Sequence, residues 1–332
     1  MRYILSLILL LLLSACTTES QNSVTVYVSE DQVFSEPLLK DFEKESGIKV
    51  NAIYDTEESK STGVMNRLIA EKNNPQADVY WANEPIRAEV LKQKGILAPY
   101  KSPNAKGIPK NFKDKDYYWT GFSARVRLFI AQNGRTKKPT SIMAYTLPEF
   151  KAKTVIANPL FGTTTAHVAA LFTLWKEEKT KIFLTQLKTN QVRVSTSNGE
   201  SANFVANGSY LFSLVDSDDA FSRLKAKEKV QIIYPDQDKN EIGAFVVPNS
   251  VMLMKNAPHV KRAKQLIDYL LSKKSEEKLA FADCAQIPLH PNVPMPSYIK
   301  PIEQIKVMPV DFEKVAKKMI EIQTYLKEWV QK

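Results

Sequence analysis

The sequence predicts an α/β protein made of two domains. Short strand-like runs rich in β-branched residues alternate with amphipathic helical segments along the chain. The chain has 332 residues, and removal of a short apolar N-terminal stretch still leaves enough for two domains of ordinary size. Its composition is that of a globular protein, with 44% hydrophobic and 25% charged residues. The 18 prolines and 10 glycines favour defined turns over flexible repeats.

The N-terminus predicts an export signal. Arg2 precedes an apolar run over residues 4–13 that is too short to span a bilayer, and small residues follow it. The ending Leu13-Ser14-Ala15-Cys16 resembles the lipobox of bacterial lipoproteins, in which the cysteine is acylated. We therefore expect a signal peptide over residues 1–15, lipidation of Cys16 and a lipidated tether over residues 16–23. The alternative is an ordinary signal peptide that happens to end near a cysteine.

Cysteine usage and charge argue against a disulfide-stabilised fold and against a nucleic-acid-binding protein. If Cys16 is the acylation site, Cys284 is left alone, so no internal disulfide is expected. The formal net charge of +10 comes mostly from dispersed lysines and not from a basic cluster interleaved with aromatic residues. We therefore expect no nucleic-acid partner, and we interpret the excess as a soluble basic surface facing an anionic membrane.

The first half of the mature chain predicts a βαβαβα unit, whose helical crossovers require parallel strands. We expect Ser35 to cap the first helix, Pro37 to stand in its first turn and Gly47 to end it. The expected strands are 24–28, 48–54 and 78–81, and the three helices bury Leu38, Leu39 and Phe42, then Met65, Leu68 and Ile69, then Ile86, Val90 and Leu91.

The second half, which begins after Trp119, predicts another unit of the same class. The expected strands are 127–131, 154–157, 191–195, 210–215 and 230–234, with further extended runs at 244–248 and 251–254. The expected helices are 166–178, 219–224, 257–271, 275–281 and a long one from Asp311 to about Val330.

Polar residues gather where an expected strand ends and the next helix begins. They are Ser29, Glu30, Asp31, Asn83, Glu84, Gly162, Thr163, Thr164, Thr165, Asp216, Ser217, Asp218 and Asp219. In open α/β sheets, ligands bind outside the carboxyl ends of the strands, where helix N-termini also present free N–H groups. These loops therefore predict one shared binding crevice. The alternative for each loop alone is helix capping, since the same residue types are preferred there.

The segment Asp216-Ser217-Asp218-Asp219 indicates most about the ligand. Three carboxylates so close together cannot all stay ionised in a dry cleft without a cation, a basic side chain or raised pKa values. Arg125 and Arg127 are the candidate partners within the chain. A hard metal ion, or a polyhydroxylated or aminated solute, could compensate them instead. The alternative is structural, with Asp216 capping the next helix and the other two in its first turn.

The inventory of reactive groups argues against an enzyme. His167, His259 and His290 are the only histidines, and they show no Ser-His-Asp spacing, zinc pattern or phosphate loop. His167 stands beside apolar residues, as a packed histidine would. We expect a binding protein without a catalytic residue or cofactor.

Several segments together resemble family 1 extracellular solute-binding proteins, and most of all the branch of ferric-iron receptors. They are the first strand with its loop, and the segments 42–50, 77–81, 119–127, 246–250 and 257–259. The resemblance implies a type 2 periplasmic-binding-protein fold, with two α/β lobes and a ligand cleft between them. It implies linkers near 123–127 and 243–248, with lobe 1 formed by 24–124 and 248–290, and lobe 2 by 125–247 and 291–332.

The same resemblance implies a function and its partners. The chain would be the exported, lipid-anchored receptor of an ABC importer, a monomer that delivers a small solute to a permease and its ATPase. The implied solute is ferric iron, as transported ligand. The candidate ligand-binding residues are Ser29, Asp31, Asn83, Glu84, Arg125, Gly162, Thr163, Thr164, Asp216, Asp218 and Asp219, with Asp218 and Asp219 as metal ligands.

The sequence departs from the ferric receptors at the residues that bind iron. Those receptors use a neighbouring pair of tyrosines, which align with Asp218 and Asp219, a histidine at Asp31 and a glutamate at Asn83. None of the four matches, so coordination by tyrosinate does not carry over. Aspartates could still hold a hard cation. The acidic loop also suits the alternative, a receptor for an organic or phosphorylated anion such as a sugar phosphate.

Overall fold

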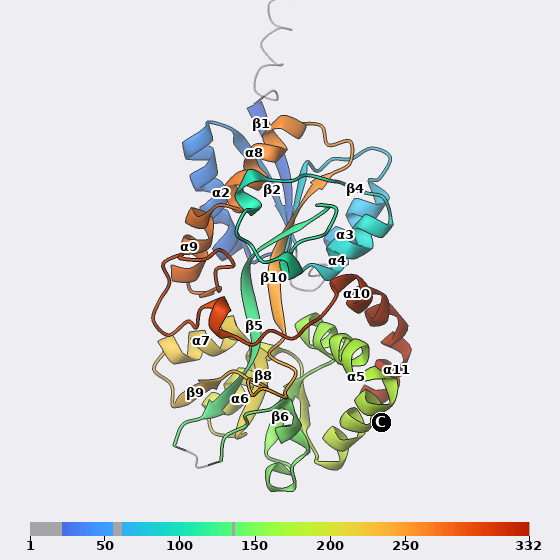
Figure 1. Ribbon diagram of the computed structural model, residues 1–332, viewed down its shortest axis with the longest axis vertical. Helices are drawn as coiled ribbons and strands as arrows, with labels where there is room; N and C mark the ends of the chain where they lie inside the picture. The colour runs from blue at the N-terminus through green and yellow to red at the C-terminus, as the bar shows by residue number, and fades with distance from the viewer. Residues whose placement is uncertain (1–21, 56–61, 135–136, 332) are drawn as a thin grey trace, which may run out of the picture.

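The computed structural model describes residues 22–55, 62–134 and 137–331 (Figure 1). The predicted signal peptide, Cys16 and the tether up to residue 21 lie outside these ranges. Across the described ranges, no helix is both long enough and apolar enough to cross a membrane.

The described chain alternates strands and helices, as the sequence predicts. The strands are β1 (Ser23–Val28), β2 (Lys49–Tyr54), β3 (Val79–Ala82), β4 (Leu97–Ala98), β5 (Thr120–Gln132), β6 (Thr154–Ala157), β7 (Arg193–Ser195), β8 (Phe212–Asp216), β9 (Val230–Ile233) and β10 (Val246–Met254). The α-helices are α2 (Gln32–Ser46), α3 (Thr62–Ala70), α4 (Ile86–Gln93), α5 (Gly162–Thr189), α6 (Asn198–Ala206), α7 (Ser217–Lys225), α8 (Val260–Leu270), α9 (Lys273–Phe281), α10 (Phe312–Glu321) and α11 (Gln323–Gln331). Short 3-10 helices are η2 (Pro103–Ala105), η3 (Lys110–Phe112), η4 (Ile142–Thr146), η5 (Pro148–Phe150) and η6 (Ile302–Gln304).

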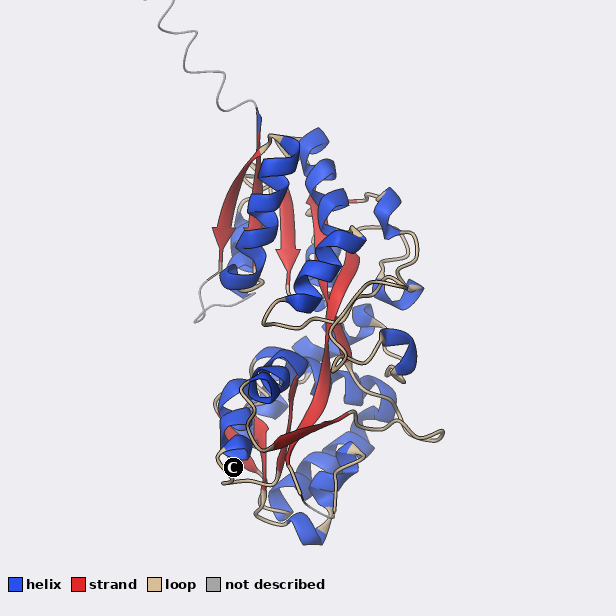
Figure 2. Ribbon diagram, turned by 90° about the vertical axis from the view of Figure 1, so that its left-hand side faces the viewer, coloured by secondary structure: helices blue, strands red, loops and turns tan. Residues whose placement is uncertain are grey.

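The strands form two lobes that share two long strands. The strand order is β2-β1-β3-β10-β5-β8-β6-β7, with β4 beside β10 and β9 beside β5. β1 runs parallel to β2 and β3, and β6 runs parallel to β7 and β8, whereas β5 and β10 pair antiparallel with their neighbours. β5 and β10 pass from the upper to the lower lobe (Figures 1 and 2). The predicted α/β class and two-lobed architecture are thus confirmed.

Buried apolar side chains pack along the sheet in both lobes and form one continuous core. In the upper lobe the Trp81 and Phe122 rings lie 5.3 Å apart, centroid to centroid. In the lower lobe Phe129, Tyr145 and Phe150 surround Phe212, with centroid distances of 5.1, 5.1 and 5.0 Å. Burying one such side chain contributes about 1.5–3 kcal/mol, so these rings fix each lobe around its sheet.

The expected start of the first helix is wrong. α2 begins at Gln32 with Asp31 in the N-cap position, and Ser35 lies inside the helix. The Ser35 Oγ donates to the Asp31 carbonyl oxygen at 2.9 Å. Because the turn after β1 is only three residues long, the helix starts early and Pro37 stands in its interior, where it removes one donor.

Other expected elements differ in extent. α5 is longer than predicted and has a kink at Lys176, whose φ of 68° and ψ of 178° are not helical. The long C-terminal helix is divided into α10 and α11, which end and begin on either side of Ile322. β5 begins at Thr120, well before the expected start, and the two extended runs before α8 form the single strand β10. α6 was not predicted.

Candidate ligand site

The candidate site lies where loops of the two lobes approach the shared strand β5. Arg125 of β5 donates a hydrogen bond from Nη2 to the carbonyl oxygen of Asn83, in the loop after β3. Burial disfavours its charged form, but Glu30 and Asp31 of the upper lobe and Asp218 of the lower lobe outweigh this and raise the pKa of Arg125. Arg125 therefore interacts electrostatically with acidic residues in loops of both lobes.

Arg127, further along β5, organises the lower-lobe side. Its buried guanidinium donates from Nη1 to Asp216 Oδ1 at 3.2 Å and to Asn198 Oδ1 at 2.7 Å, and from Nη2 to Thr164 Oγ1 at 3.1 Å. Thr163 Oγ1 donates to Asp216 Oδ2 at 2.7 Å. A buried ion pair needs these additional hydrogen bonds, because desolvation offsets much of the Coulomb attraction. Asp216 is therefore compensated by one of the two expected arginines, and it makes no side-chain cap on α7.

Asp218 and Asp219, in the first turn of α7, are compensated far less. With Asp216 they place one carboxylate oxygen each within 4.8 Å of one another. Burial, together with the charge of Asp216, raises the pKa of Asp218 to about 6 even though Arg125 opposes the shift. Burial and the charge of Asp218 raise the pKa of Asp219 well above its ordinary value. Within the described ranges, the one hydrogen bond found for these two carboxyl groups comes from the Asp219 N–H to Asp218 Oδ1, at 3.1 Å.

The acidic residue of the β3–α4 loop has a different environment. One carboxylate oxygen of Glu84 accepts the Ile86 N–H, and the other accepts the Arg87 N–H at 3.2 Å. The Arg87 Nη1 lies 2.9 Å from the same carboxylate. Glu84 is buried and its oxygens are occupied by the first turn of α4, so it acts as a helix cap.

The other upper-lobe candidates lie at the carboxyl ends of β1 and β2. Ser29 Oγ donates to Asp55 Oδ2 at 3.1 Å and lies 2.9 Å from the Tyr80 hydroxyl. Ser29 is buried, whereas Asp31 at the start of α2 is partly exposed. Asp31 is therefore more accessible than Ser29 and Glu84.

The start of α5 adds backbone donors on the lower-lobe side. Gly162 opens the helix with φ at 59°, a conformation that glycine adopts without strain. The first N–H groups of a helix have no acceptor within the helix, and its dipole favours negative charge there. Thr163 and Thr164 are buried and their hydroxyls face Asp216 and Arg127.

Sequence reasoning missed Asn198, Asp55, Tyr80 and Arg87. Asn198 begins the unpredicted α6, and its Nδ2 donates to Thr163 Oγ1 at 3.2 Å. The signal for Asp55 was available, because it directly follows an expected strand. Tyr80 was assigned to a buried strand, and nothing in the pattern set its hydroxyl apart from the core.

The histidines have structural environments. Burial lowers the pKa of His167 to about 3, and its ring stacks on Phe245 with centroids 5.2 Å apart. His259 Nδ1 lies 3.0 Å from Asp78 Oδ2, and His290 Nδ1 lies 2.8 Å from Glu276 Oε2. None of the three lies beside a hydroxyl or thiol nucleophile in these contacts.

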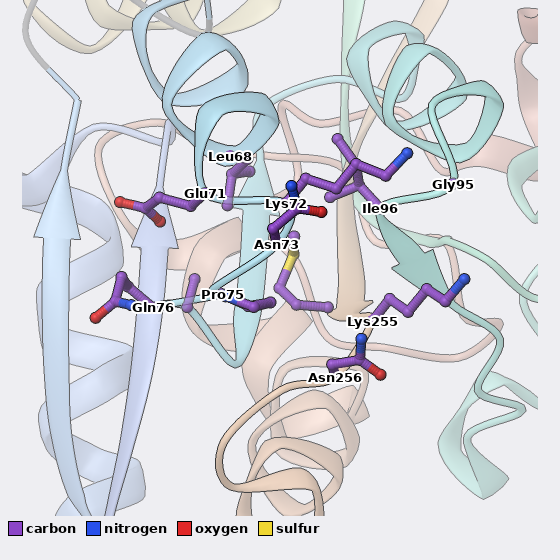
Figure 3. A pocket seen from close by; sticks show the side chains of 12 residues that line it. Leu68, Glu71, Lys72, Asn73, Pro75, Gln76, Gly95, Ile96, Lys255 and Asn256 are labelled. Atoms are coloured by element: carbon purple, nitrogen blue, oxygen red, sulfur yellow. The ribbon is translucent and has the colours of Figure 1, made fainter.

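A separate pocket of the upper lobe lies away from this site. It is lined by Leu68, Glu71, Lys72, Gln76, Ile96 and Lys255 among others (Figure 3). These residues surround the segment before β3 and the end of β10, which is the opposite end of the parallel strands from Ser29. Ligands of open α/β sheets bind outside the carboxyl ends of the strands, so this pocket is not the candidate site.

Two lobes with polar loops facing a shared pair of strands define a solute receptor of the two-lobed type. The sequence matches the family of bacterial extracellular solute-binding proteins over residues 38–302, and the chain belongs to that family. It is 26% identical to iron uptake protein A1 of Synechocystis over 298 residues, which covers 84% of this chain and 81% of that protein.

Solved structures agree with the fold. The chain superposes on the apo ferric ion-binding protein A of Pasteurella haemolytica with a TM-score of 0.80 and 23% identity, covering 93% of this chain and 98% of that one. The periplasmic binding protein AfuA of Actinobacillus pleuropneumoniae, solved with fructose-6-phosphate, gives a TM-score of 0.76 and 23% identity over 94% and 98% of the two chains. The predicted type 2 periplasmic-binding fold is therefore confirmed.

These findings establish the function at the level of the family. The protein is a periplasmic solute-binding protein of an ABC importer, and it is not an enzyme. Proteins of this class bind a small ligand and work with a membrane permease and its ATPase, as the sequence predicted.

Proposed function

We propose that the transported solute presents positive charge to the cluster formed by Asp216, Asp218 and Asp219, and that ferric iron is the first candidate. One observation carries the proposal: three carboxylate oxygens lie within 4.8 Å of one another, and two of these carboxyl groups have raised pKa values. A cation bound there would supply the compensation that the chain leaves incomplete.

The chemistry of the donors supports a hard cation. Carboxylate oxygens are hard ligands, and Arg127 already neutralises Asp216, so Asp218 and Asp219 carry the remaining charge. Asp31 adds another accessible carboxylate from the upper lobe. A relative of this chain is named as an iron uptake protein. Coordination would differ from the tyrosine pair of the ferric receptors, because aspartates stand at both positions.

The second candidate is a phosphorylated organic anion such as a sugar phosphate. Two features favour it: the charged Arg125 guanidinium between the lobes, and the N–H groups at the start of α5. A structural neighbour, AfuA, was solved with fructose-6-phosphate. In this arrangement the sugar hydroxyls would donate to the aspartates while the phosphate lies near Arg125.

Thermal unfolding with defined probes separates the two candidates. The full chain, purified without refolding, is titrated with ferric citrate and, separately, with fructose-6-phosphate. The test variant is Asp218→Asn with Asp219→Asn. The matched control is Asp116→Asn with Asp238→Asn, which removes the same charge from two exposed positions.

The outcomes are distinct. We expect ferric citrate to raise the melting temperature of wild type and control, and to have no such effect on the test variant. Stabilisation by fructose-6-phosphate alone favours the second candidate. Equal stabilisation of the test variant and the control by ferric citrate contradicts a role of the acidic cluster. Citrate alone and gallium citrate show whether the metal or the anion is responsible.

We also propose that Cys16 carries a lipid anchor and that the receptor acts as a monomer. The lipobox-like sequence before Cys16 supports the anchor. In a bacterial host, Cys16→Ser should move the protein from the membrane fraction to the soluble fraction. An unchanged membrane fraction contradicts the proposal, and light scattering of the released form checks the monomer.

The lobe boundaries 24–124 with 248–290, and 125–247 with 291–332, remain our proposal. They are supported by the passage of β5 and β10 between the lobes (Figure 1). α10 packs against both α4 and α5, so it contacts elements on either side of the proposed division. Hydrogen exchange in the presence of ligand would show whether residues 291–332 move with lobe 2.

A further inference from the structure

The strand β5 carries a bulge where the chain passes between the lobes. In the pairing of β5 with β10, Ala124 faces Pro248 and Phe122 faces Asn249, which leaves Ser123 without a partner residue. Ser123 has φ at 40°, a left-handed conformation that is costly for a residue other than glycine. A bulge bends the strand and interrupts the ladder of hydrogen bonds, so it tolerates proline, which has no N–H to donate.

Side chains from outside the ladder hold the backbone of Ser123. Its N–H donates to Glu276 Oε1 at 2.8 Å, and its carbonyl oxygen accepts from Asn249 Nδ2 at 2.8 Å. The Ser123 hydroxyl is buried and finds no hydrogen-bonding partner within the described ranges. Because Ser123 is fully buried, its N–H would be left unsatisfied without Glu276.

Glu276 is itself fixed by a network in the upper lobe. Its carboxylate is fully buried and also accepts the N–H groups of Leu289 and His290, at 2.8 and 2.9 Å. His290 Nδ1 lies 2.8 Å from Glu276 Oε2, and His290 Nε2 lies 2.8 Å from the Asn104 carbonyl oxygen. Both ring nitrogens thus face acceptors, which suits the imidazolium form. The carboxylate is therefore a rigid part of α9 and its surroundings.

The neighbouring residue extends this contact. Ala124 exchanges two backbone hydrogen bonds with Ile287, at 2.7 and 2.8 Å. The bulge is therefore attached to the upper lobe on one side, while β5 begins to pair with β8 of the lower lobe only at Arg127. The stretch from Ser123 to Arg127 is where a change in the angle between the lobes must be absorbed.

We propose that Ser123 is the pivot about which the two lobes close, and that Glu276 is the positioning residue that fixes its geometry. The carboxylate holds an unfavourable backbone conformation in place and so limits the range of angles between the lobes. The proposal rests on the two-lobed fold and not on the identity of the solute, so the test uses the protein without ligand.

The test variant is Glu276→Gln, and the matched control is Glu277→Gln, an exposed position on the same helix. The glutamine NH2 group must stand either against the Ser123 and Leu289 N–H groups, which share Oε1, or against the His290 N–H, which faces Oε2, so contacts on one side are lost. We expect amide exchange at Ser123, Leu289 and His290 to rise at least tenfold in the test variant, with exchange in β1 and β8 unchanged. Small-angle scattering should give a radius of gyration outside the spread of wild type and control.

A second variant keeps the proposal testable if Glu276→Gln fails to fold. Ser123→Gly removes the cost of the left-handed conformation and leaves the buried carboxylate in place. It should widen the range of inter-lobe angles, seen as a changed scattering profile with a native melting transition. The proposal is overturned if both variants keep wild-type amide exchange at the bulge and a wild-type scattering profile. If Glu276→Gln does not fold, the same wild-type results for Ser123→Gly alone overturn it.

Discussion

The two lobes use acidic residues after their strands in opposite ways. In the upper lobe, Glu84 follows β3 and places both carboxylate oxygens on the first turn of α4 and on Arg87. In the lower lobe, Asp218 and Asp219 follow β8, and their carboxyl groups have almost no partners among the described residues. The same sequence signal thus gives a helix cap in one place and a charge that the chain compensates only in part in the other. A carboxylate can contribute to cation binding only where its oxygens do not already accept hydrogen bonds from the chain.

The largest effect should come from removing the arginine that compensates Asp216. Arg127→Met leaves Asp216 buried without its cation, and we expect a loss of about 3–5 kcal/mol in the free energy of unfolding, measured with urea. The matched control, Lys225→Met, breaks the exposed pair with Asp283 and should change stability by less than about 0.5 kcal/mol. Equal effects of the two substitutions would contradict the assignment of Arg127 as the buried partner.

Neutralising the uncompensated pair should stabilise the ligand-free protein. Burial raises the pKa of Asp218 to about 6, so its ionised form destabilises the fold at neutral pH. Asp218→Asn with Asp219→Asn should gain about 1–3 kcal/mol at pH 7.5. The gain should shrink as the pH falls below about 6, because the wild-type Asp218 carboxyl group is then protonated. A variant less stable than wild type at pH 7.5 would argue that these carboxylates have a cationic partner in the free protein.

The upper-lobe acid should respond in the opposite direction. Glu84→Ala removes the cap of α4 and leaves Arg87 without this carboxylate, so we expect a loss of about 1–2 kcal/mol in urea unfolding. Its effect on ligand affinity should be small compared with that of Asp218. If Glu84→Ala instead stabilises the free protein and abolishes ligand binding, the contrast between the two lobes is wrong.

The smallest effect concerns His290 beside the proposed pivot. Burial disfavours its charged form, but hydrogen bonding to Glu276 and the charge of that carboxylate raise the pKa of His290. A raised histidine pKa stabilises the fold fully below the unfolded value of about 6.5, and the stabilisation is lost as the pH rises through the folded value. The stability advantage of wild type over His290→Gln should therefore decline as the pH rises above about 6.5. A pH-independent difference would contradict a charged His290.

Most of the architecture could be predicted because it depends on local periodicity. The strand and helix alternation and the parallel order around β1 follow from apolar spacing and from the crossover rule, whereas the two lobes were implied by the resemblance to solute-binding proteins. The early start of α2 could not be predicted, because Ser35 is as good a capping residue as Asp31 by type. The kink at Lys176 and the break at Ile322 could not be predicted, because no proline or glycine stands at either position.

The site was less accessible to sequence reasoning. The loops were found because strand ends carry polar residues, yet the pattern could not say which carboxylates are already occupied. Glu84 and Asp218 both stand at the start of a helix, so residue type and position did not show that Glu84 accepts nearby N–H groups and Arg87 whereas Asp218 does not. Asn198 and Glu276 act through contacts with residues distant in sequence, Asp216 and Ser123, which no local pattern encodes.

The measurement that tests the cation site most directly is anomalous diffraction at the iron absorption edge from crystals grown with ferric citrate. The proposed function predicts one strong peak within coordinating distance of the Asp218 and Asp219 carboxylates, and its disappearance in the Asp218→Asn, Asp219→Asn protein. A fully occupied iron peak elsewhere, or a cleft filled by an organic anion with no peak, would contradict it.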